Sequence, residues 1–74
     1  MFEKQKLKGT IKKLKQEIND IEAKRSRSQA ALVQAILEQK DPSDEDVEFF
    51  NRYTAEIEQV RDQLKQAQDK LAGL

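Results

Sequence analysis

The chain has 74 residues, and its 14 basic and 14 acidic side chains give a formal net charge of zero. It contains no His, Cys or Trp, which removes the usual ligands of structural zinc and the usual base or thiol of nucleophilic catalysis. No apolar run approaches the roughly 20 residues of a membrane span. We therefore expect a non-enzymatic cytoplasmic protein without a metal, another cofactor, a small-molecule substrate or a membrane partner.

A helix is predicted over residues 3–40, because apolar side chains recur there at alternating steps of three and four, the period of coiled coils. The stripe consists of Leu7, Ile11, Leu14, Ile18, Ile21, Arg25, Ser28, Leu32 and Ala35. Arg25 and Ser28 interrupt it near its centre. Either Arg25 extends its charged head out of an apolar seam while Ser28 specifies the register, or segment 25–28 binds a phosphate or an acidic partner.

A loop is predicted at about residues 41–43, because Pro42 disfavours helical geometry in the residue before it. Ser43 is the favoured N-cap of the next helix, and the acidic residues after it complement the positive end of the helix dipole. The loop does not fit a calcium-binding EF-hand. Counting from Asp41 puts Asp46 and Arg52 at the positions that need Gly and Glu. We expect this acidic run to cap a helix rather than to bind a metal.

A second helix is predicted over residues 44–72, with the same period of apolar side chains. Its stripe consists of Phe50, Tyr53, Ile57, Val60, Leu64, Ala67, Leu71 and Leu74. Each member pairs with a member of the first stripe at a constant residue-number sum of 85, from Ala35 with Phe50 to Ile11 with Leu74. This pairing predicts an all-α fold in which residues 1–74 form one antiparallel two-helix coiled-coil hairpin.

One hairpin offers little core, since chains below about 70 to 80 residues rarely gain more than about 3 to 5 kcal/mol from a single core. We therefore expect a homodimer that forms a four-helix bundle. Further apolar side chains lie outside the seam, as expected for a helix with more than one neighbour. We predict that they form the interface with a second copy or another protein; they are Ala30, Val33, Ile36, Leu37 and Phe49.

The charges divide the chain into two halves. Residues 1–27 carry nine Lys or Arg and four Asp or Glu, and residues 28–74 carry five and ten. In a hairpin the acidic run lies at the tip and the lysines lie at the open end. Charge attraction favours a dimer that overlaps head to tail along its full length. Apolar matching instead favours a shorter antiparallel overlap of the two tip halves, so both geometries remain open.

The function predicted from these features is protein–protein interaction by a homodimerising adaptor, regulator or assembly component. The alternative is a regulatory hairpin that binds RNA, because clustered lysines neutralise phosphates. The lysines that would contact nucleic acid are Lys4, Lys6, Lys8, Lys12, Lys13 and Lys15. In length and predicted topology the chain resembles small bundle-forming hairpins that bind RNA.

Overall fold

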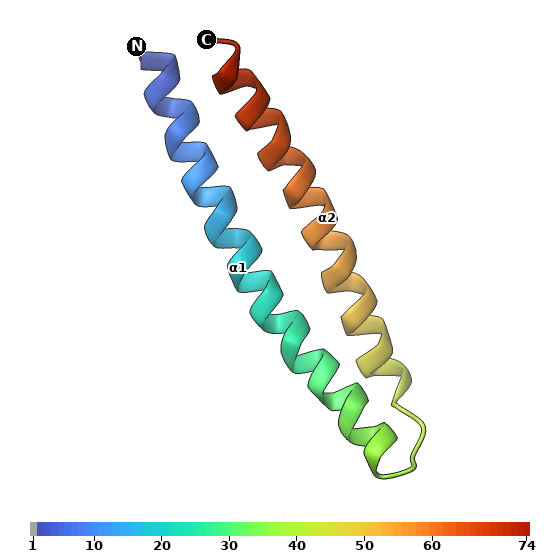
Figure 1. The fold of residues 1–74 in the computed structure, drawn as a ribbon. Helices are drawn as coiled ribbons and strands as arrows, with labels where there is room; N and C mark the ends of the chain where they lie inside the picture. Colours follow the sequence, from blue (N-terminus) through green and yellow to red (C-terminus); the bar gives the residue numbers. More distant parts are fainter. Residues whose placement is uncertain (1) are drawn as a thin grey trace.

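The computed structural model describes residues 2–74, which form two long helices joined by one loop. Helix α1 spans Phe2–Leu37 and helix α2 spans Asp44–Ala72. The helices run antiparallel and side by side, so the beginning of α1 and the end of α2 lie at the same end of the molecule (Figure 1). The result is a rod that measures 57 × 15 × 14 Å. The predicted all-α hairpin is confirmed.

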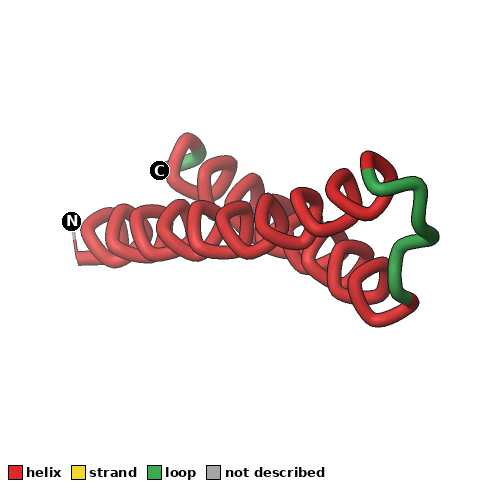
Figure 2. The backbone as a smooth tube through the Cα atoms, turned by 90° about the horizontal axis from the view of Figure 1, so that it is seen from below, coloured by secondary structure: helices red, strands yellow, loops and turns green. Residues whose placement is uncertain are grey.

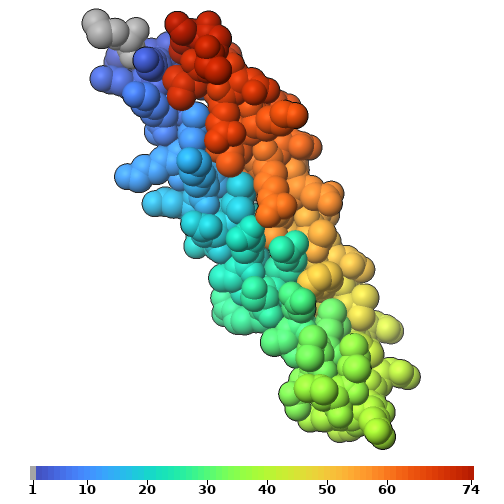
Figure 3. Space-filling model, viewed as in Figure 1, coloured from blue at the N-terminus to red at the C-terminus, as the bar shows by residue number. Residues whose placement is uncertain are grey.

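The seam between the helices follows the predicted stripes. Figure 2 shows the helices crossing one another, as coiled helices do, and in Figure 3 the two halves of the chain touch along the rod. Every predicted seam residue of α1 and α2 is buried or half-buried. The buried ones are Ile18, Ile57 and Ala67, and of these Ile57 is fully buried. Ile18 and Ala67 are one of the predicted pairs, and Ile57 is predicted to lie opposite the small Ser28.

An ion pair beside the seam agrees with the same register. Arg61 Nη2 of α2 donates to Glu22 Oε1 of α1 over 3.0 Å. In the predicted pairing this bridge lies between the layers of Ile21 with Leu64 and Arg25 with Val60. Both side chains are partly exposed, so the pair contributes little to stability, of order 0 to 1 kcal/mol. Its value is that it shows which side chains become neighbours across the seam.

The outermost predicted layer does not form. Leu74 was expected to pack against Ile11, but its side chain is 63% exposed. The reason is that α2 ends at Ala72, and Gly73 takes the C-cap position with its N–H bonded back to Asp69. Leu74 lies beyond the helix and no longer follows its period. That part of the seam prediction is wrong.

Helix α1 ends at Leu37, three residues before the expected end near residue 40, and the loop is correspondingly longer, over residues 38–43. The cause is Gln39, whose φ of 58° lies in the left-handed region. The N–H of Gln39 bonds to Ile36 O at 3.0 Å and the N–H of Lys40 to Ala35 O at 2.9 Å. This pair of bonds is a Schellman motif. It ends the helix several residues before Pro42, so the proline is not the cause of the helix end.

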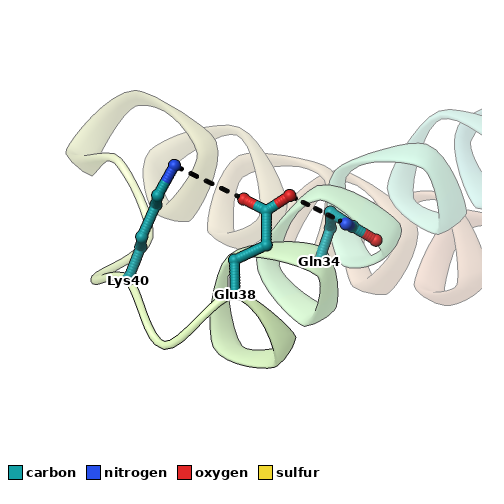
Figure 4. Close-up of polar contacts among 3 residues, drawn as sticks. All are labelled: Gln34, Glu38 and Lys40. Atoms are coloured by element: carbon teal, nitrogen blue, oxygen red, sulfur yellow. Dashed lines mark hydrogen bonds and ion pairs between the residues drawn. The ribbon is translucent and has the colours of Figure 1, made fainter.

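Side chains also tie the loop to the last turn of α1. Glu38 accepts a hydrogen bond from Gln34 Nε2 at 3.0 Å and forms an ion pair with Lys40 at 3.7 Å (Figure 4). At the other end of the loop, Ser43 is the N-cap of α2 and its Oγ accepts the N–H of Asp46 at 3.1 Å. The predicted N-cap is confirmed. Three acidic residues in the first turn of α2 complement the dipole.

The burial of Ile57 allows the packing of the seam to be tested. Its side chain is only 1% exposed, so Ile57→Ala removes methyl groups from a packed layer and should lower the free energy of unfolding by about 2 to 5 kcal/mol. Glu58→Ala, at the exposed neighbouring position, should change it by less than about 0.5 kcal/mol. Urea unfolding followed by circular dichroism at one fixed chain concentration measures both. Equal losses would contradict the seam.

The left-handed backbone conformation of Gln39 allows the loop geometry to be tested. A non-glycine residue in this region costs roughly 1 to 2 kcal/mol, and Gln39→Gly removes that cost against a smaller entropic penalty. We expect a gain of about 0.5 to 1 kcal/mol in the free energy of unfolding. The matched control is Gln66→Gly in the middle of α2, which should lose about 1 kcal/mol. Thermal unfolding of both variants shows whether each substitution raises or lowers the free energy of unfolding. A lower free energy of unfolding for Gln39→Gly would refute the Schellman assignment.

Candidate interaction surfaces

The register divides the side chains beside the seam into two flanks, one on each side of the hairpin. We call the first the bridge flank because it holds the Glu22–Arg61 ion pair. It consists of Lys8, Lys15, Glu22, Gln29 and Ile36 of α1 with Val47, Thr54, Arg61 and Gln68 of α2. We call the second the hollow flank. It consists of Thr10, Glu17, Lys24 and Ala31 of α1 with Phe49, Glu56, Gln63 and Lys70 of α2.

The bridge flank carries exposed apolar side chains near the tip. Ile36 of α1 and Val47 of α2 have the residue-number sum of 83 that Glu22 and Arg61 also have, so they occupy the equivalent cross-helix positions. Ile36 is 64% exposed and Val47 is 40% exposed. The outer face of α1 extends this surface with Val33 and Leu37, 47% and 73% exposed, and with exposed Ala30. We call these five residues the tip patch.

The tip patch contains four of the five residues predicted as an interface, and it adds Val47, which the sequence reasoning missed. The signal for Val47 was available, because the sum of 83 follows from the seam register once the flanking positions are considered. The stripe alone did not show it, since Val47 lies before the first seam residue of α2.

Phe49 is the predicted interface residue that does not join the tip patch. The period of α2 places it on the hollow flank, where it is half-buried. Its ring stacks on Tyr53 with centroids 6.3 Å apart and an interplanar angle of 16°. The Arg52 guanidinium lies 5.7 Å from its centroid, within the range of a cation–π contact. Neighbours on its own helix therefore cover part of this ring.

The hollow flank contains two open depressions between the helices. The central one, of about 370 Å³, has an apolar floor of Ile21 and Val60. Its rim is polar and consists of the charged Glu17, Asp20, Lys24 and Glu56 and the neutral Gln59. The second, of about 270 Å³, lies at the open end and is lined by Glu3, Lys6, Leu7, Thr10 and Lys70. This flank is therefore concave and polar, whereas the bridge flank is apolar near the tip.

The six lysines of the nucleic-acid alternative are all exposed on α1. They do not form one stripe. The helical period directs Lys8, Lys12 and Lys15 toward the bridge flank and Lys6 and Lys13 toward the hollow flank. The basic surface is therefore spread around the start of α1, and each flank presents only part of it to one ligand.

Arg25 and Ser28 are half-buried at the predicted seam positions. Among residues 2–74, no buried side-chain nitrogen or oxygen lacks a hydrogen-bond partner, and Arg25 takes part in none of the side-chain hydrogen bonds or ion pairs found there. Its guanidinium therefore reaches solvent while its aliphatic stem covers the seam. This geometry favours the structural interpretation of segment 25–28 over a dedicated phosphate site.

Within residues 2–74, no three His, Cys, Asp or Glu side chains gather closely enough to hold a metal ion. Over the same residues, neither helix has a stretch whose length and apolar character would let it cross a membrane. No protein-family model matches the chain, and searches of curated proteins and of solved structures find nothing similar to it. The surfaces of the hairpin are therefore the features from which a function can be inferred.

Proposed function

We propose that this protein is a non-enzymatic adaptor that acts through protein–protein interaction, as a homodimer of hairpins forming a four-helix bundle. One surface of each hairpin serves self-association and the tip patch binds a different protein. The observation that carries this proposal is the tip patch, where side chains that normally lie in a core are 40% to 73% exposed on one side of the rod.

The amount of exposed surface supports self-association. The hairpin exposes 5977 Å², whereas a compact monomer of 8.6 kDa exposes about 4,700 Å² by the general scaling of surface with mass. Its radius of gyration is 16.8 Å, against about 11 Å for a globular chain of this length. Only three described side chains are buried. A second hairpin would cover part of this surplus and enlarge the core.

Two surfaces are needed because the tip patch is small. Its four large side chains amount to a patch of a few hundred Å², about the size of the largest apolar patch on ordinary monomers. A stable dimer buries about 800 Å² on each partner. The tip patch therefore suits one short apolar element of a partner better than it suits the whole dimer contact.

The mass in solution tests self-association. We expect sedimentation equilibrium to give a mass near twice the 8.6 kDa of one chain, because pairing buries surface that the single rod leaves in water. A mass of one chain at all accessible concentrations would contradict the homodimer.

Substitutions in the tip patch separate an adaptor from an RNA-binding protein. We expect Val33→Ser with Leu37→Ser to abolish capture of a protein partner while helicity and dimer mass stay unchanged, since both side chains are exposed. Lys12→Gln with Lys15→Gln is the control and should retain that partner. Capture of RNA, with loss on lysine neutralisation and a steep fall with salt, would instead support the nucleic-acid alternative.

A further inference from the structure

The face of α1 that borders the hollow flank carries an ordered set of four charges. Glu17 and Asp20 are followed by Lys24 and Arg27, and all four side chains are exposed. We call these four residues the charge stripe. Like charges lie three residues apart within each pair, which is mildly unfavourable in an isolated helix. None of the four belongs to an ion pair among those formed by residues 2–74. Asp20 and Lys24 also lie four residues apart, which is a favourable spacing within one helix, and Glu17 has Lys13 four residues before it. Arg27 has no acidic residue three or four positions away on α1, so contacts within the helix explain only part of the arrangement.

The charge stripe is complementary to itself in an antiparallel contact. A two-fold axis that crosses α1 at the level of residue 22 pairs residues whose numbers sum to 44. It sets Glu17 opposite Arg27 of a second copy, and Asp20 opposite Lys24 of that copy. Each pair occurs twice, as in every isologous contact. Four attractive pairs therefore form without any like-charge pair among these residues.

Neighbouring positions on α1 add one further pair of opposite charges. The same axis sets Lys6 opposite Glu38, Thr10 opposite Gln34 and Lys13 opposite Ala31. Glu38 already contacts Lys40 and Gln34 of its own chain (Figure 4). In the pair of Lys6 with Glu38, the carboxylate of Glu38 therefore interacts with its own chain and with the second copy.

Charge also disfavours the adjacent registers on this face. Moving the contact by one heptad in one direction brings Lys13 against Lys24 and Glu17 against Asp20. Moving it in the other direction brings Lys24 against Arg27 near the centre, and the attractive pair of Lys13 with Glu38 that it also forms lies farther out. Both shifts create repulsion at the centre of the contact, which charge patterns use to reject wrong registers. The arrangement with sum 44 is therefore the favoured one.

Helix α2 gives an independent indication of the same axis. In the hairpin, the seam sum of 85 places Gln63 at the level of residue 22. A two-fold axis at that level sets Gln63 opposite itself and Glu56 opposite Lys70 of the second copy, which is again attractive. Glu56 lines the central depression and Lys70 lines the one at the open end. The axis also brings Phe49 of the second copy to the level of residue 8, next to Leu7, which lines the latter depression.

We infer that two hairpins pack face to face through their hollow flanks, head to tail, with α1 along α1 and α2 along α2 of the second copy. This inference rests on the proposed homodimer and specifies its geometry. It selects the full overlap over the overlap of tip halves. The tip patches then lie away from the dimer contact, one at each end of the bundle, where each remains open to a different protein.

Charge-clustered variants test this geometry. The acidic variant carries Lys24→Glu and Arg27→Glu, and the basic variant carries Glu17→Lys and Asp20→Lys. Each alone turns four attractive pairs into repulsive ones, so at low salt its dimer dissociation constant should rise at least about tenfold. An equimolar mixture should form heterodimers almost exclusively, because mixing restores all four attractions. Sedimentation equilibrium and native mass spectrometry measure the two effects.

Matched controls carry the same changes of net charge away from the hollow flank. They are Lys12→Glu with Lys15→Glu, and Glu58→Lys with Asp62→Lys, all at exposed positions. The dimer dissociation constant of each control variant should stay within about threefold of the wild-type value. A mixture of the two control variants should show no comparable excess of heterodimers. Salt near 1 M shortens the screening length to about 3 Å and should remove most of the defect in the charge-stripe variants.

Three outcomes would overturn the inference, and they are distinguishable. A wild-type dimer that both charge-stripe variants leave unchanged refutes this face while the proposed homodimer stands. Equal heterodimer excess in the control mixture refutes it as well, since net charge alone would then drive mixing. A monomeric wild type refutes the homodimer and this geometry together, and leaves only the tip patch as an interaction site.

Discussion

The packing of α1 against α2 along one apolar seam is the interaction on which every other feature of this hairpin depends. Among the described residues no further element covers either helix, so Ile18, Ile57 and Ala67 are the only buried side chains there. In two layers a large side chain is predicted to face a small one, Ile18 with Ala67 and Ile57 with Ser28. These two layers let the helices approach closely, and a shift that set two large side chains in one of them would lose that close approach.

The register in turn produces two flanks of different chemistry. The Glu22–Arg61 ion pair shows which positions meet on the bridge flank, and the same relation joins Ile36 to Val47 in the tip patch. The hollow flank instead presents concave, charged surface around an apolar floor of Ile21 and Val60. Apolar exposure and ordered charge therefore occupy opposite sides of one rod. In the proposed function, that separation leaves one side of the rod for a second copy and the other side for a different protein.

Several details depended on local backbone geometry that composition and period describe poorly. Ser43 was recognisable as an N-cap, because few residue types accept the free N–H groups of a first turn. The end of α1 was not, since a glutamine rather than a glycine takes the left-handed position, and propensity places glycine there. Phe49 looked like a continuation of the apolar set on α1. In the hairpin it faces the other flank and stacks on Tyr53.

The sequence by itself determined that two helices fold back on one another and which residues within the two helices share the seam. A sustained heptad period with a constant residue-number sum admits one antiparallel register. Only the tertiary structure decided how the remaining side chains divide between the two sides of the rod, and where surface between the helices is hollow. The physical reason is that a helical period fixes the angle of each side chain around its own axis. Which side chains remain exposed to solvent depends on where the second helix packs, because that helix covers the side chains that face it.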